Sequence, residues 1–228
     1  MTTIVFALYP QLTQLDFTGP FEVLTKLPGA RCTVASVAGG ELHSDSGLAF
    51  AGLQRLTDVP ACDVLCVPGG DGVTAAMDDA AFLAELRRLA AGAHWVTSVC
   101  TGSLLLAAAG LLHGKRSACH WAWRDLLRPF GALPDEARVV EDGRFMSGGG
   151  VTAGIDMALT LVARIAGPTV ARAVQLGMEY APAPPFDSGR PERADPAVLA
   201  MVLRRGAPAR VRRQAAVERA LAALAAAA

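Results

Sequence analysis

The sequence has no excess of charge of either sign. Its 228 residues include 21 lysines and arginines and 21 aspartates and glutamates, and charged residues make up only 18% of the chain. Proteins that bind nucleic acids or anionic membrane surfaces usually present a strongly basic face. The balanced composition therefore predicts no nucleic-acid partner and no membrane-surface partner.

Long apolar runs are lacking as well. No stretch reaches about 18 uncharged apolar residues, the length that a membrane-spanning helix needs. The N-terminus has no basic segment followed by an apolar run, which is the pattern of a secretory signal. We therefore expect a soluble protein with no membrane partner.

Cysteines are few and do not form obvious pairs. There are five, an odd number, and several lie in or beside apolar strand-like runs, which argues against a disulfide framework. Cys62 and Cys66 are separated by three residues, but no second pair of ligands follows, so no metal site is predicted. This use of cysteine fits the reducing cytoplasm.

Hydrophobic residues are abundant: they make up 52% of the sequence, enough for one α/β domain with a sizeable core. Near-continuous apolar runs are typical of strands buried on both faces of a parallel sheet. An amphipathic segment, residues 79–91, predicts a helix that crosses from one strand to the next. Runs of the strand type occupy residues 3–9, 32–37, 63–67 and 94–99.

The C-terminal part, residues 191–228, is predicted to be a helical extension packed on the α/β domain of residues 1–190. Gly206 and Pro208 are expected to divide this extension into two helices. Three of its arginines are expected to lie on a solvated face: Arg210, Arg212 and Arg213.

Cys100 stands between the predicted strand at residues 94–99 and a helix that runs from Ser103 to a stop at Gly110. A sharp strand-to-helix turn exposes the side chain at its tip above the edge of the sheet. The helix N-terminus offers free N–H groups and the positive end of the helix dipole. This setting is expected to lower the pKa of the Cys100 thiol and make it a nucleophile. The alternative is a small core cysteine.

Asp16 lies just past the C-terminal end of the first predicted strand. In open α/β sheets this edge is where functional sites are built. Position alone leaves two roles open for Asp16, a carboxyl group of the site or a cap of the helix that follows.

Two glycine-rich turns follow predicted strands. Gly69 and Gly70 come directly after residues 63–67, and their bare backbone can bring N–H groups close enough to hold an oxyanion. Gly149 and Gly150 belong to a second turn between a strand and a helix and can leave room beside the nucleophile. His120 follows a short strand-like segment and is a secondary candidate for reaching Cys100.

Four segments of the sequence share the pattern of one protein family: Leu15–Val23, Val67–Gly70, Ser98–Gly102 and Gly148–Asp156. Over most of residues 1–190 the chain resembles the ThiJ/PfpI superfamily of class I glutamine amidotransferase-like proteins. The resemblance implies a flavodoxin-like α/β fold, a doubly wound sandwich with a mostly parallel central sheet. It also implies a homodimer.

Within this superfamily the chain most resembles enzymes that hydrate isocyanides. Three features carry this resemblance: Asp16, which stands where many relatives have Glu, the sequence Cys100-Thr101-Gly102, and the loop Pro184–Gly189. The chain departs from relatives with His directly after the cysteine, because Thr101 is there, which argues against protease-like triad chemistry. The resemblance implies that Cys100 is the nucleophile and Asp16 its paired carboxyl group. The N–H groups of Thr101 and Gly70 would form the oxyanion site. No metal or organic cofactor is implied, and the expected partners are a small-molecule substrate and a second copy of the chain.

The implied reaction converts an isocyanide to an N-substituted formamide through a thioimidate on Cys100, with Asp16 as the proton donor. A pocket walled by Phe17, Phe21 and residues 148–150 would favour apolar substituents. Two alternatives stay open. One is a glyoxalase or deglycase, which usually needs Glu and His close to the cysteine. The other is an oxidation sensor or holdase whose cysteine becomes a sulfinate.

Overall fold

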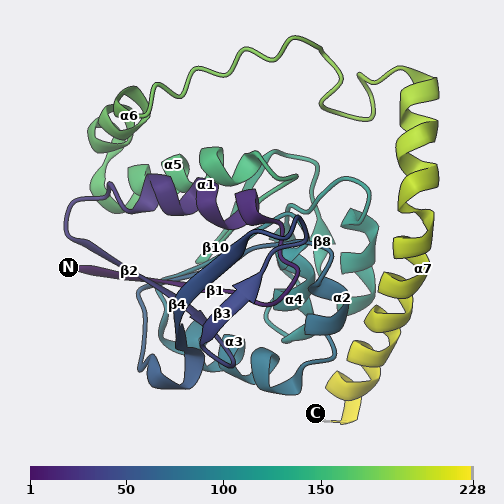
Figure 1. Ribbon diagram of the computed structural model, residues 1–228, viewed down its shortest axis with the longest axis horizontal. Helices are drawn as coiled ribbons and strands as arrows, with labels where there is room; N and C mark the ends of the chain where they lie inside the picture. Colours follow the sequence, from purple (N-terminus) through teal and green to yellow (C-terminus); the bar gives the residue numbers. More distant parts are fainter. Residues whose placement is uncertain (227–228) are drawn as a thin grey trace.

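The computed structural model describes residues 1–226 and contains an eight-stranded sheet with helices on both faces (Figure 1). The strand order is β3-β4-β2-β1-β5-β6-β10-β9. The five pairs from β4 to β10 are parallel, and only the outer pairs β3–β4 and β10–β9 are antiparallel. The predicted fold class, a flavodoxin-like sandwich with a mostly parallel sheet, is therefore confirmed. The strands are β1 (Thr2–Ala7), β2 (Ala30–Ser36), β3 (Gly40–His43), β4 (Ala49–Arg55), β5 (Val64–Val67), β6 (Trp95–Val99), β9 (Val139–Asp142) and β10 (Phe145–Gly148).

The core lies on both faces of β1, β5 and β6. Every residue of β5 is buried, and Ile4 and Phe6 of β1 have almost no exposed surface. Strands covered by helices on both sides need apolar residues at consecutive positions rather than alternate ones. This explains why the continuous apolar runs of the sequence coincide with the central strands.

The helices form two layers. Helices α1 and α5 pack against each other on one face of the sheet, whereas α3 covers the opposite face and packs against α4 (Figure 1). None of the helices within residues 1–226 combines the length and the apolar character that crossing a bilayer requires. The helices are α1 (Gln14–Leu24), α2 (Val73–Ala76), α3 (Ala80–Gly92), α4 (Gly102–Ala108), α5 (Ala153–Ala166), α6 (Pro168–Gly177) and α7 (Pro196–Ala226), with short 3₁₀ turns η1 (Leu56–Asp58) and η2 (Arg124–Phe130).

Irregular additions lie at the two edges of the sheet. At one edge β9 and β10 form a hairpin at Asp142-Gly143, where Gly143 takes a positive φ of 61°. A type of turn that requires positive φ favours glycine at this point. A separate pair of short strands, β7 (Arg116–Ser117) and β8 (Leu133–Pro134), lies between α4 and this hairpin in the sequence.

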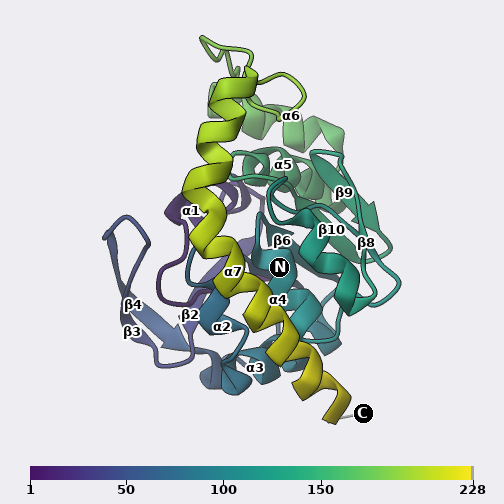
Figure 2. The same cartoon turned by 90° about the vertical axis from the view of Figure 1, so that its right-hand side faces the viewer.

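The C-terminal extension is one helix, so the prediction of two helices is wrong. Helix α7 has 31 residues and contains both Gly206 and Pro208. It crosses the molecule beside α2, α4 and η2 (Figure 2). Proline inside a helix costs about 3 kcal/mol, but its ring is exposed here and α7 buries a stripe further along. The buried stripe consists of Arg213, Ala216, Val217 and Ala220.

Candidate active site

Cys100 sits on the tight turn between β6 and α4, as predicted. Its φ angle is +58°, a left-handed conformation that residues other than glycine seldom adopt. The backbone holds this strained turn from below: the Cys100 N–H donates to the carbonyls of Gly148 at 3.0 Å and Gly149 at 2.8 Å. Residues whose strained backbone conformation is held in place in this way cluster at functional sites. The residue is only 6% exposed.

Asp16 faces the same turn from α1. The residue is 2% exposed, and its Oδ2 accepts a hydrogen bond from the Gly69 N–H at 3.0 Å. The cap of α1 is Thr13, so the interpretation of Asp16 as a helix cap is wrong. The other carboxyl oxygen, Oδ1, is buried and has no hydrogen-bond partner within the described residues. An unpaired buried carboxyl oxygen is costly and is expected where a group must react.

The turn after β5 places Gly69 against Asp16 and against Thr101, the residue after Cys100. A Cβ atom at Gly69 would lie 2.6 Å from the Thr101 nitrogen and 2.8 Å from Asp16 Oδ2, so only glycine fits. Tyr9 supports the turn, because its hydroxyl donates to the Pro68 carbonyl at 3.0 Å. The site thus joins the C-terminal ends of β1, β5 and β6.

Thr101 binds the same turn through its hydroxyl group. The Gly70 N–H donates to Thr101 Oγ1 at 3.0 Å. The N–H group expected from the family resemblance to hold an oxyanion is therefore already bonded in this structure. The Thr101 N–H, in contrast, interacts with the Cys100 sulfur and lowers the pKa of that thiol.

Burial dominates the protonation of Cys100 and Asp16. Burial raises the pKa of Asp16 to about 7, against the opposing effects of the Gly69 N–H and the Cys100 thiol. Burial first, and then the negative charge of Asp16, raise the pKa of the Cys100 thiol well above its usual value. The expected net lowering of this pKa by a helix N-terminus is therefore wrong, because burial and the charge of Asp16 act in the opposite direction and are larger. The pair retains at least one proton at neutral pH.

A cavity of about 950 Å³ lies beside the second glycine turn. Gly149 and Gly150 form part of its wall, next to His120, whose Cδ2 atom would lie 3.1 Å from a Cβ at Gly150. Burial, followed by the charge of Arg213, lowers the pKa of His120 to about 4, so the ring is neutral at pH 7. Its Nδ1 accepts from the Ala122 N–H at 3.2 Å.

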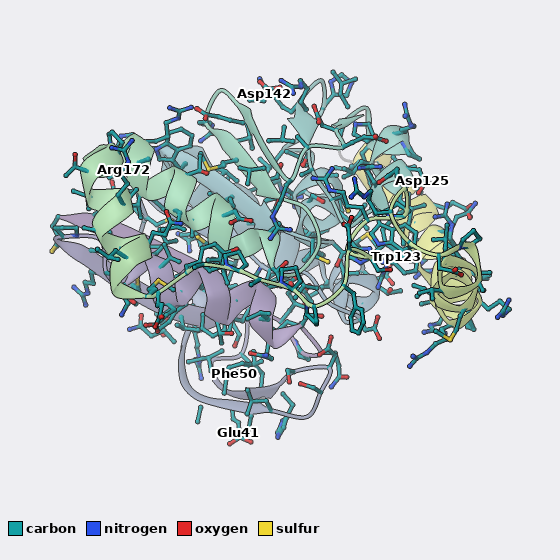
Figure 3. The ribbon with its side chains drawn as sticks, turned by 90° about the horizontal axis from the view of Figure 1, so that it is seen from above. Glu41, Phe50, Trp123, Asp125, Asp142 and Arg172 are labelled. Atoms are coloured by element: carbon teal, nitrogen blue, oxygen red, sulfur yellow. The ribbon has the colours of Figure 1, made fainter. Side chains whose placement is uncertain are left out.

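Phe17 and Phe21 do not line this cavity, contrary to the prediction. They pack edge to face against Phe6 in the core beneath α1, with Phe50 of β4 on the outer side (Figure 3). The walls of the cavity are polar instead and include Arg124, Glu136 and Arg138. No group of three or more His, Cys, Asp or Glu side chains within residues 1–226 is arranged to hold a metal ion.

Comparison with known proteins identifies the family of this chain. The model of the DJ-1/PfpI family matches residues 2–164, well over half of the chain. The chain belongs to the DJ-1/PfpI family. Among solved DJ-1/PfpI-type structures, a ThiJ/PfpI family protein from Pseudomonas syringae is 38% identical, with a TM-score of 0.92 over 95% of this chain and 90% of that one.

Curated relatives show how widely the DJ-1/PfpI domain is used. Isonitrile hydratase from Pseudomonas putida is 49% identical to this chain over 221 residues, which are 97% of each protein. The transcriptional regulator CdhR from Pseudomonas aeruginosa is 32% identical over 153 residues, but these cover only 44% of that protein. The similarity to the hydratase thus includes α7, which the match to the DJ-1/PfpI family model does not reach.

One residue of this DJ-1/PfpI chain lies at the site without having been predicted there. Arg213 of α7 is 2% exposed, so the expectation that it is solvated is wrong. Arginine in an Ala-rich helix is normally read as a surface residue. The one available signal is spacing: Arg213 occupies the first position of an i, i+3, i+4, i+7 stripe completed by Ala216, Val217 and Ala220.

Proposed function

We propose that this protein hydrates isocyanides to N-substituted formamides, with Cys100 as the nucleophile. The observation that carries the proposal is the pairing of Cys100 with a buried carboxyl group, Asp16, at one edge of the sheet. The terminal carbon of an isocyanide must receive both a nucleophile and a proton, which is what a thiolate and a neutral acid supply. The similarity to the isonitrile hydratase of Pseudomonas putida over 97% of the chain supports the substrate class.

The first half of the reaction forms a covalent intermediate. Because the thiol holds its proton more tightly than the carboxyl group, Cys100 first passes this proton to the Asp16 carboxylate. The Cys100 Sγ then bonds to the terminal carbon of R–NC, and Asp16 gives the proton to that same carbon, which leaves a thioimidate, R–N=CH–S–Cys100. The raised pKa of Asp16, about 7, makes the carboxyl group a proton donor near neutral pH. The Thr101 N–H stabilises the thiolate before the attack.

The second half of the reaction releases the product. Water adds its oxygen to the thioimidate carbon and one proton to the nitrogen. The carbon–sulfur bond then breaks, the thiolate leaves, and the second proton of the water returns to the Asp16 carboxylate. The product is R–NH–CHO, and the net reaction consumes one isocyanide and one water.

An assay for formamide tests the proposal. The purified protein is incubated with one aryl and one alkyl isocyanide, and the formyl proton of the product is followed by NMR. Cys100→Ala is expected to abolish turnover, because no other group replaces the nucleophile, whereas Cys32→Ser in β2 should leave it nearly unchanged. Substantial activity in Cys100→Ala would rule out the covalent mechanism.

The same preparation tests the alternative of a glyoxalase or deglycase. That chemistry needs a histidine close to the cysteine, but the contacts of His120 are with Gly150, Trp121 and Ala122. We therefore expect no conversion of small dicarbonyls. Conversion of a dicarbonyl without formation of any formamide would replace the hydratase proposal.

A further inference from the structure

Arg213 is a buried cation brought to the edge of the site by the C-terminal helix. Its guanidinium lies over the ring of Trp123, 4.0 Å from the centroid, and Figure 3 shows Trp123 and Asp125 beside α7. Its Nη2 lies 3.5 Å from the Gly70 carbonyl oxygen and 3.5 Å from Asp71 Oδ1. Its Nε is buried and has no hydrogen-bond partner within the described residues.

These contacts do not compensate fully for the burial of a charge. The carboxylate of Asp71 is 75% exposed, so water screens its attraction for the guanidinium. An incompletely paired charge in a dry site is destabilising, and such groups are retained where they serve a function. Arginine keeps its proton even when burial lowers its pKa, so the positive charge of Arg213 persists.

The charge acts on the groups around the nucleophile. The titratable groups near Cys100 come from three elements besides its own: Tyr9 from the end of β1, Asp16 from α1 and Cys119 from the segment after β7. Arg213 interacts with the negative forms of Cys100, Tyr9 and Cys119. Its positive charge accordingly lowers the pKa of Tyr9 and of Cys119.

A short chain of contacts also joins Arg213 to the nucleophile turn. The Gly70 carbonyl that faces the guanidinium also accepts from the Thr101 hydroxyl at 3.4 Å. Thr101 is the residue directly after Cys100. A shift of the Gly70 peptide would therefore disturb the turn on both sides of the thiol.

We propose that Arg213 is a positioning residue of the Cys100 site. Its buried positive charge favours the thiolate, and its guanidinium fixes the Gly69–Gly70 turn through the Gly70 carbonyl. The role in catalysis rests on the proposed function, but the effect on the thiol does not. Burial and Asp16 both oppose ionisation of Cys100, and the buried cation acts against them.

The test measures the thiol directly. The alkylation rate of Cys100 by iodoacetamide is followed from pH 5 to pH 10 by mass spectrometry of its peptide. In Arg213→Gln the rate at every pH in this range should fall about tenfold, as expected if the thiol pKa, already well above its usual value, rises by about one further unit when a nearby opposite charge is removed. Arg213→Lys keeps the charge and should recover most of the rate. Arg210→Gln, which removes an exposed arginine paired with Asp125 on the same helix, is the control and should change neither quantity.

A second variant leaves the buried side chain intact. Asp71→Asn removes an exposed carboxylate that water already screens from Arg213, so alkylation at pH 7 should stay close to the wild-type rate. A tenfold loss of rate in Asp71→Asn, or an unchanged pH profile in folded Arg213→Gln, would overturn the proposal. Formamide production is measured in parallel: a wild-type protein that is alkylated normally but produces no formamide would contradict the hydratase function alone.

Discussion

Cys100 and Asp16 would each carry a negative charge if ionised, in a site from which water is almost completely excluded. Burial penalises both charges, and each charge penalises the other. The two groups therefore titrate as a unit that holds a shared proton, rather than as a free thiolate beside a free acid. The chemistry proposed for isocyanides uses this proton and returns it.

Asp16→Asn tests how much the burial of the Asp16 carboxyl group destabilises the fold, through the pH dependence of the melting temperature. The folded pKa of about 7 lies above the unfolded value of about 3.9, so between these values the folded state binds more protons. Ionising Asp16 thus weakens the wild-type fold as pH rises from 4 to 7, by up to about 4 kcal/mol. Asn does not titrate, so the melting temperature of the variant minus that of the wild type should grow between pH 5 and pH 8.

Turnover in the same variant separates the proton donor from a structural role. Asn cannot give a proton to carbon, so formamide production should fall by roughly 10²-fold or more. Thr3→Ala, which removes a hydrogen bond to Asp63 at the far end of β1, is a matched control for the loss of a polar contact. A pH-independent difference in melting temperature together with near-normal turnover would show that Asp16 is not the donor.

The sequence predicted which residues form the site better than it predicted their protonation states. Cys100, Asp16, Thr101 and Gly69 lie together, as expected from strands that end at one edge. The direction of the thiol pKa was wrong because a sequence shows a helix N-terminus but not how dry the site is. Burial of the site involves segments far apart in the sequence: Asp16 of α1, Thr101 at the start of α4 and Arg213 of α7 are each only 2% exposed.

At the scale of elements, the turn after β5 has to be made of glycine. Gly69→Ala would place a methyl group 2.6 Å from backbone at Thr101, where neither side can move easily. We expect a loss of about 1–3 kcal/mol of stability, measured by urea unfolding, and a larger relative loss of turnover. Gly92→Ala at the end of α3 meets nothing within 4 Å and is the control; it should be neutral or slightly stabilising. Equal effects of the two substitutions would contradict the close approach.

In helix α7, packing against the body of the protein overrides the local sequence preferences. Gly206 and Pro208 predict a break, but the helix continues because residues 213–220 bury a continuous stripe against the body of the protein. Nothing within the 31 residues themselves reveals what they pack against. Arg213 was expected in solvent for the same reason: the sequence of the helix does not show which of its faces is covered. The strands, in contrast, were predictable, because burial on both faces leaves a continuous apolar run in the sequence.

Pro208→Ala tests the conflict between the helix-breaking tendency of proline and the continuous helix α7. The proline lacks the N–H that the helix needs, and its ring is exposed, so replacing it leaves no cavity. The substitution should raise the free energy of unfolding by about 1–3 kcal/mol. Ala207→Ser next to it is the control and should change stability by only a few tenths of a kcal/mol. A lower melting temperature for Pro208→Ala would mean that the ring makes a contact that stabilises α7.

At the scale of the whole molecule, apolar side chains remain exposed on the first half of α7. This half of the helix lies away from the sheet, at the right of Figure 1. Its large exposed hydrophobic residues are Val198, Met201, Val202 and Leu203. Exposed apolar side chains gathered on one helix are typical of an interface.

We propose that a second copy of the chain covers this region, in line with the homodimer that the sequence predicts. Light scattering should give about twice the chain mass of 23.6 kDa. Val202→Glu would bury a carboxylate in the interface, so it should shift the mass toward that of one chain. Val37→Glu, at an exposed valine after β2, adds the same charge elsewhere and should leave the mass unchanged. A wild-type mass near 23.6 kDa at micromolar concentration, or equal masses for both variants, would show that these side chains do not form a dimer interface.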